Sequence, residues 1–264
     1  MERRSVLILG HGSRVARANA EFEALVRAFR ARRPDLDLDH AYVELAAPLL
    51  ADGLAAVAAR ADRVVLLPLF LLAAGHVKDD VPEALSEARA RFPAVRFDAA
   101  RVLGVVNRMV ELTLARAGER VPLRTAEAGR TALLTVGRGS SDFDANSDFC
   151  KLTRILGERG GFRRADPSFI AIASPLFEAA AEDLAKVHDG PILVQPYFLF
   201  DGLLVEQLAR EVDAFAARHR GRDVRLGAHL GPDARLLELL EERLAEVLGG
   251  SATLACQACP RAVA

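Results

Sequence analysis

The 264-residue sequence has few of the features that mark secreted or membrane-bound proteins. It holds only three cysteines, which excludes a disulfide framework and predicts a cytoplasmic protein in a reducing compartment. No apolar run reaches the roughly 18 residues that a membrane-spanning helix needs. The first apolar run, Ser5 to Leu9, is too short for a signal peptide and leads into Gly-His-Gly, which is no cleavage site.

An excess of charge of either sign is also missing. The 35 Lys and Arg residues nearly balance 36 Asp and Glu residues, and the formal net charge is −1. This balance argues against nucleic acid or an anionic membrane as a standing partner. With 51% apolar and 27% charged residues, the composition is typical of a globular protein with a sizeable core, in one large domain or two of ordinary size.

Strand-length apolar runs alternate with helical patterns along the whole chain, which predicts parallel sheets covered by helices. The runs occupy residues 5–9, 39–45, 63–72 and 95–102 in the first half and 131–136, 169–173, 191–199 and 224–228 in the second. Loop motifs repeat with a period of about 127 residues, as in Gly10-His11-Gly12-Ser13-Arg14 and Gly137-Arg138-Gly139-Ser140-Ser141. We therefore expect similar α/β domains at 1–120 and 128–250 that face each other across a cleft, followed by a tail at 251–264.

Two histidines follow strand-like runs of the first half. His11 lies between glycines that let the backbone turn sharply, and His76 lies between the third apolar run and a helix expected from about Val81 to Arg91. If their strands are neighbours, both rings reach the carboxyl edge of the sheet, where parallel sheets bind ligands. Two imidazoles with open positions suit cobalt, nickel, iron or zinc. The alternative is that each histidine only hydrogen-bonds its own loop.

The second half has lost this pair, because Arg138 stands in place of His11 and Leu203 in place of His76. Arginine stays protonated and cannot bind a metal, so metal chemistry is expected in the first half alone. Arg138, with serines at an expected helix start, is suited to holding carboxylates. The alternative is that this loop is retained only as scaffold.

Five other residues are candidates for a functional role or need a structural explanation. Glu44 ends the second strand and could meet the edge that carries His11, although an ordinary exposed acid is the alternative. His229, at a strand end of the second half, is the only other histidine candidate. Cys150, on an expected helix, is predicted to be a core residue. Cys256 and Cys259 have metal-ligand spacing, but two thiolates complete neither a tetrahedral nor an Fe–S site. We therefore expect a disordered tail, with a metal centre as the alternative.

The two Gly-x-Gly-Ser motifs, together with the long motif from Pro68 to Pro82, resemble the CbiX/SirB type of class II tetrapyrrole chelatases from about residue 5 to residue 248. The resemblance implies two flavodoxin-like domains, each a four-stranded parallel sheet flanked by helices, with the tetrapyrrole in the cleft. It implies a lyase that inserts Co²⁺ or Fe²⁺ into sirohydrochlorin without ATP. Short family members have one half and dimerise. This chain resembles the fused long form, so a monomer is expected, with a dimer as the alternative.

The resemblance also implies roles for particular residues. His11 would be metal ligand and proton acceptor, His76 the second ligand, and Glu44 a substrate contact. The substrate-binding strip would consist of Leu71, Leu72, Ala73, Ala74, Gly75 and His76. Ser13, Arg14 and Arg138 lie where the carboxylates of the substrate are expected.

Three functions remain open at this point. Cobalt insertion for cobalamin biosynthesis is the first, iron insertion for sirohaem biosynthesis is the second, and a non-catalytic tetrapyrrole or metal carrier is the third. A nucleotide-binding protein is disfavoured, because the chain has no P-loop and its glycine motif lacks the third glycine of a dinucleotide fingerprint.

Overall fold

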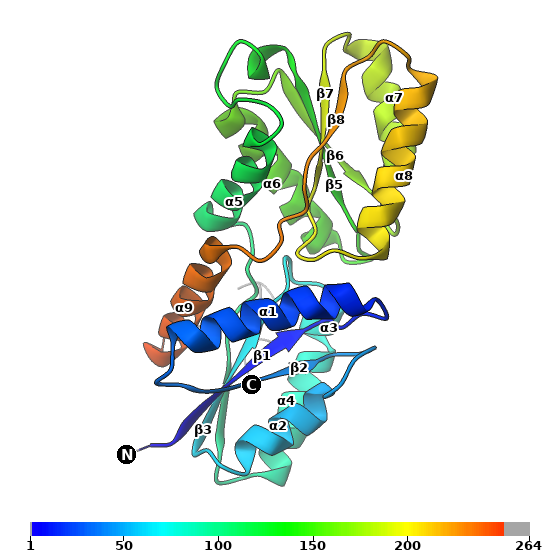
Figure 1. Ribbon diagram of the computed structural model, residues 1–264. Helices are drawn as coiled ribbons and strands as arrows, with labels where there is room; N and C mark the ends of the chain where they lie inside the picture. Colours follow the sequence, from blue (N-terminus) through cyan, green and yellow to red (C-terminus); the bar gives the residue numbers. More distant parts are fainter. Residues whose placement is uncertain (1, 251–264) are drawn as a thin grey trace. The chain divides into compact units, whose positions relative to one another are not determined.

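The computed structural model describes residues 2–250 (Figure 1), with His76 described through its backbone alone. These residues form two compact units: the first combines residues 2–104 with 232–250, and the second spans Val105–Gly231. The predicted tail with Cys256 and Cys259 lies outside the described residues. Within 2–250, no helix is long and apolar enough to cross a membrane.

The first unit contains a four-stranded parallel sheet in the order β2-β1-β3-β4. Its strands are β1 (Arg4–Gly10), β2 (Asp37–Tyr42), β3 (Arg63–Pro68) and β4 (Arg96–Ala99). Its helices are α1 (Ala16–Arg32), α2 (Leu50–Ala58), α3 (Gly75–Lys78), α4 (Asp80–Arg91) and α9 (Ala234–Leu248). The central strands β1 and β3 are neighbours and almost wholly buried, as continuous apolar runs predict.

The second unit repeats this sheet in the order β6-β5-β7-β8. Its strands are β5 (Ala132–Gly137), β6 (Arg164–Phe169), β7 (Ile192–Pro196) and β8 (Val224–Leu226). Its helices are α5 (Asn107–Gly118), α6 (Phe143–Gly160), α7 (Phe177–Val187) and α8 (Leu203–Arg218), with a 3₁₀ turn at Ala128–Arg130. The match extends to cis peptide bonds at Ala47–Pro48 and Ser174–Pro175, which confirms the duplicated α/β fold.

Helices cover both faces of each sheet (Figure 1). In the first unit, α2 and α4 pack on the sheet face formed by Leu7, Leu9, Val64 and Leu66. In the second unit, α7 and α8 cover the corresponding face of β5 and β7. Side chains of a strand alternate between faces, so Val6 and Ile8 of β1 point to the side opposite α2 and α4.

The last helix of each sequence repeat packs in the unit formed by the other repeat. Helix α9, orange to red in Figure 1, packs against α1 and β3 of the first unit, and the green helix α5 packs against α6 and β7 of the second. The buried stripe of α9 includes Leu236, Leu240 and Leu244. The compact units therefore differ from the predicted ranges 1–120 and 128–250 by an exchange of these two helices.

Three local predictions need correction. The strand expected at 169–173 lies earlier, because β6 (Arg164–Phe169) is an edge strand whose first residues are polar and form no apolar run. Helix α6 buries positions such as Phe149, Leu152 and Leu156, whereas Cys150 lies off this stripe and is exposed, so its prediction as a core residue was wrong. Strand β3 ends at Pro68, and His76 falls within the four-residue helix α3 instead of directly at a strand end.

Candidate functional site

The loop that carries His11 is held against the loop that carries Glu44. The amide of Val43 donates to the carbonyl of Gly10 and the amide of Glu44 to the carbonyl of His11, both at 3.0 Å. Gly12 has a φ of 90°, and a Cβ at this position would overlap the carbonyl oxygen of Glu44. The second glycine of the Gly-His-Gly motif is therefore required for the close approach of the two loops.

His11 and Glu44 face each other at the carboxyl edge of the first sheet. The distance from Nε2 of His11 to Oε1 of Glu44 is 3.7 Å, and the two side chains are 32% and 47% exposed. Nδ1 of His11 lies 3.2 Å from the carbonyl oxygen of Gly12. A proton on Nδ1 would be donated to that carbonyl, which leaves the Nε2 lone pair on the side of the carboxylate. The carboxylate also stabilises an imidazolium that forms when His11 accepts a proton.

The strip that follows β3 lies beside this pair. The ring of Phe70 is 6.4 Å from the ring of His11, and Leu71, Leu72, Ala73 and Ala74 are half-buried. Gly75 is exposed, and a Cβ there would meet nothing within 4 Å. Because the side chain of His76 is outside the described structure, its pairing with His11 stays a prediction. No group of three His, Cys, Asp or Glu side chains is arranged to hold a metal in the part of the chain that is described.

Ser13 and Arg14 differ in what they are free to bind. The hydroxyl of Ser13 accepts a hydrogen bond from the amide of Val15 at 3.1 Å, and its carbonyl accepts one from Asn19 at 2.8 Å, so Ser13 shapes the start of α1. Arg14 is exposed, and no hydrogen bond or ion pair joins its guanidinium to the described residues. Of the two, Arg14 offers the cation for a substrate carboxylate.

The corresponding loop of the second unit has the same construction. Ser140 accepts from the amide of Asp142 at 3.0 Å, and Asn146 donates to the carbonyl of Ser140 at 2.7 Å. Asp142 caps α6, because its Oδ1 accepts from the amide of Asp144 at 2.9 Å. This carboxylate occupies the helix start. The remaining group suited to an external anion is the exposed Arg138, whose guanidinium makes no hydrogen bond or ion pair with described residues.

Exposed apolar side chains gather at the carboxyl edges of the two sheets, a feature that the sequence patterns did not single out. Seven large apolar residues are exposed in the described chain: Leu45, Leu49, Phe143, Ile172, Leu176, Val187 and Leu203. All but Val187 lie in loops or helix starts that follow the strands. Their recurrence at the repeat spacing, as in Leu49 and Leu176, was the signal that could have identified them. Such edges suit a ligand with a broad apolar face.

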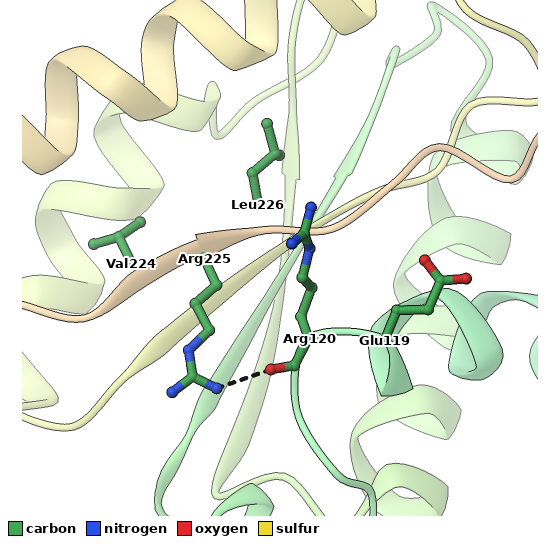
Figure 2. Close-up of a pocket in the computed structure, with 5 residues that line it drawn as sticks. All are labelled: Glu119, Arg120, Val224, Arg225 and Leu226. Atoms are coloured by element: carbon green, nitrogen blue, oxygen red, sulfur yellow. Dashed lines mark hydrogen bonds between the residues drawn. The ribbon is translucent and has the colours of Figure 1, made fainter.

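A shallow pocket of the second unit lies elsewhere, between the end of α5 and the edge strand β8. Glu119, Arg120, Val224, Arg225 and Leu226 line it (Figure 2). The Arg225 guanidinium is already satisfied by Asp223 and Glu127, each at 2.6 Å, and by the carbonyl of Arg120 at 2.8 Å. With neither His nor Cys in its lining, this pocket does not provide the chemistry expected of the site.

The fold and the site define a two-repeat α/β protein whose first repeat presents an imidazole–carboxylate pair at its sheet edge. The CbiX family profile matches residues 5–120 and 132–247, and the chain belongs to this family. It is 33% identical over 262 residues to a sirohydrochlorin cobaltochelatase of Priestia megaterium, covering 97% of this chain and 84% of the relative. It is 28% identical over 251 residues to a sirohydrochlorin ferrochelatase of Bacillus subtilis, covering 94% of each chain. The solved structure of SirB from Bacillus subtilis with Fe³⁺ superposes with a TM-score of 0.81 at 25% identity, covering 94% of this chain and 97% of SirB.

Proposed function

We propose that this protein is a sirohydrochlorin chelatase, which inserts Co²⁺ into the tetrapyrrole without ATP. The observation that carries the proposal is the His11–Glu44 pair, with Nε2 and Oε1 3.7 Å apart at the carboxyl edge of the first sheet. The sequence similarity to a cobaltochelatase and a ferrochelatase supports this reaction class. The metal ion is a substrate in this scheme.

The reaction needs a group that handles both a proton and a metal. Insertion of a divalent ion into the free tetrapyrrole replaces two pyrrole N–H protons and strips water from the ion. His11 is suited to both steps, since neutral imidazole binds cobalt or iron and also accepts a proton. It cannot do both with one lone pair at one time, so the steps alternate. Glu44 stabilises the imidazolium between them, and His76 is proposed as the second metal ligand.

The substrate has a flat macrocycle with carboxylates around its rim. Leu45 and Leu49 are 45% and 46% exposed in the loop after β2, and the strip from Leu71 to His76 follows β3. These apolar groups are suited to the macrocycle. Arg14 and Arg138 are proposed to bind the carboxylates, with Ser13 fixing the loop that carries Arg14.

The choice of cobalt over iron rests on a small difference in sequence identity to the two kinds of relative. The relative with 33% identity is a cobaltochelatase, whereas the ferrochelatase relative is 28% identical. Intrinsic affinities favour Co²⁺ slightly over Fe²⁺, but metal supply decides the outcome in cells. Iron insertion is therefore the alternative within the proposal.

A spectral assay tests the proposal directly. Purified protein is mixed anaerobically with sirohydrochlorin and either Co²⁺ or Fe²⁺, and the absorbance change is compared with the protein-free rate. We expect faster insertion of both ions, with the higher kcat/KM for Co²⁺. A protein that binds sirohydrochlorin without accelerating insertion of either ion would be a carrier, and the enzymatic proposal would be wrong.

A further inference from the structure

Two arginines occupy the same place in the two exchanged helices. Arg243 of α9 is 127 positions after Arg116 of α5, and each binds the loop that follows the last strand of the sheet on which its helix packs. Arg243 donates from Nε to the carbonyl of Val102 at 3.0 Å and from Nη2 to the carbonyl of Leu103 at 2.7 Å. Arg116 donates from Nε and Nη2 to the carbonyl of Leu230 at 3.0 and 2.8 Å.

The loop held by Arg243 in turn holds the start of the proposed substrate strip. The amide of Leu103 donates to the carbonyl of Phe70, and the amide of Gly104 donates to the carbonyl of Leu71, both at 2.9 Å. The ring of Phe70 lies 6.4 Å from the ring of His11. A continuous series of hydrogen bonds therefore connects a buried guanidinium on α9 to the segment beside His11.

The first unit has an additional clamp that the second lacks. Glu246 binds Nη1 of Arg243 at 2.8 Å and also accepts from Arg101 at 2.5 and 2.9 Å. In the second unit, Glu119 pairs with Arg116 at 2.9 Å, but Ala228 stands where Arg101 would be. The loop at Val102 and Leu103 is thus held more firmly than its counterpart, and it belongs to the repeat that carries His11 and His76.

Burial of the Arg243 charge costs free energy that packing alone would not require. Its side chain is only 3% exposed, and an apolar residue of similar size would dock a helix without removing a charge from water. What the guanidinium adds is direction, because its rigid fork fixes two neighbouring carbonyls at once. Such a device is expected where the position of a loop matters to the function.

We propose that Arg243 is a positioning residue for metal insertion: through Val102 and Leu103 it sets the position of the strip from Phe70 to Gly75 relative to His11. The catalytic part of this inference rests on the proposed chelatase function. The positional part stands on the hydrogen bonds alone.

Arg243→Met removes the donors and keeps the side-chain length, and Arg116→Met is the matched control. Hydrogen exchange, the melting temperature, and kcat and KM for Co²⁺ insertion into sirohydrochlorin are compared with wild type. For Arg243→Met we expect faster exchange at the amides of Leu103 and Gly104 and a fall in kcat of about tenfold or more. For Arg116→Met we expect a similar loss of melting temperature, faster exchange at Leu230 and Gly231, and a kcat within about twofold of wild type. Arg243→Lys should recover part of the kcat.

Arg101→Met serves if Arg243→Met fails to fold, because the Arg101 side chain is 47% exposed and its loss leaves α9 packed. It should speed exchange at Leu103 and Gly104 and lower kcat by about threefold. The inference is overturned if exchange at these two amides is unchanged in the folded variants, or if Arg243→Met and Arg116→Met lower kcat equally. If wild type inserts no metal while the exchange pattern is as expected, the chelatase proposal fails and the positional role stands.

Discussion

Gly12 and Glu44 lie in backbone contact, so closely that a Cβ on Gly12 would overlap the carbonyl oxygen of Glu44. Gly139 repeats this relationship in the second unit, where a Cβ would come within 2.6 Å of the amide nitrogen of Ala173. Both glycines have positive φ, 90° and 83°. The two repeats thus share one backbone requirement, while only the first places a histidine on the loop.

Substitution of these two glycines distinguishes a loss of stability from a loss of metal insertion. Gly12→Ala and Gly139→Ala should each destabilise the protein by about 2–4 kcal/mol, from the unfavourable φ and the overlap together. Gly12→Ala should also reduce Co²⁺ insertion strongly, because it separates His11 from Glu44. Urea unfolding and the spectral assay on the folded fraction measure the two effects. Equal activity in the two variants would show that the His11 loop is not the site of insertion.

The sheets could be predicted from the sequence because their determinants are local. Continuous apolar runs identified seven of the eight described strands, but not the polar edge strand β6, which covers Arg164–Phe169 instead of the predicted 169–173. Matching loops such as Gly10 to Arg14 and Gly137 to Ser141 identified the duplication. The adjacency of β1 and β3, which places the strip after β3 beside the His11 loop, follows from the order β2-β1-β3-β4 of this doubly wound fold.

The exchange of α5 and α9 could not be predicted in the same way. An apolar stripe such as Leu236, Leu240 and Leu244 shows that a helix buries one face, but it does not show which sheet it covers. The two helices have equivalent patterns because they descend from one repeat, so the sequence does not distinguish exchange from its absence. The exposure of Cys150, in contrast, could have been predicted from the sequence. The spacing of Phe149, Leu152 and Leu156 already excluded Cys150 from the buried stripe of its helix.

His11 should matter far more to the rate of metal insertion than His229. His11→Ala should lower kcat/KM for Co²⁺ insertion by about 10²-fold or more, since it removes both a metal ligand and a proton acceptor. The kcat/KM of His229→Ala should stay within a few-fold of wild type. The second unit has Arg138 at the position of His11, so His229 has no second histidine there with which to bind a metal. Steady-state kinetics at saturating Co²⁺ make the comparison. Similar losses in both variants would mean that the second unit shares the chemistry.

The Glu246 clamp should contribute stability that depends on pH. Hydrogen bonds from Arg101, aided by the charge of Arg243, hold the pKa of Glu246 below its ordinary value. A carboxyl with a lowered folded-state pKa stabilises the protein above its unfolded value, about 4.3, and this contribution is lost as pH falls further. Glu246→Gln should therefore be less stable than wild type at pH 7, and the gap should narrow below about pH 4. Urea unfolding at several pH values tests this, and a gap that stays constant with pH would contradict it.

We expect residues 251–264, which follow α9, to contribute little to the reaction. Truncation after Gly250 should leave folding and chelation largely intact, because both sheets and their helices are complete within residues 2–250. Truncation after Gly231 should abolish a stable first unit, because it removes α9 with the buried Leu236, Leu240 and Arg243. Melting curves and the spectral assay compare the two. A shorter chain that folds at residue 250 and inserts no metal would assign the tail a part in the mechanism.

Protons and metal should compete at His11. An imidazole must be neutral to bind a divalent ion, so insertion should decline as pH falls through about 6 to 7, the range of free histidine. Added Co²⁺ should move the midpoint of this decline to lower pH. Glu44→Gln should move it the same way at fixed metal, because it removes a negative charge 3.7 Å from Nε2 that favours the protonated ring.

Calorimetric titration of Co²⁺ into the protein without substrate provides a second measurement of this competition. Binding should release more protons at pH 6 than at pH 7.5, because more imidazole is protonated at the lower pH. His11→Ala should reduce that difference, whereas His229→Ala should preserve it. If added Co²⁺ leaves the acid limb of the rate profile in place and proton release does not vary with pH, His11 acts on the tetrapyrrole alone and is not a metal ligand.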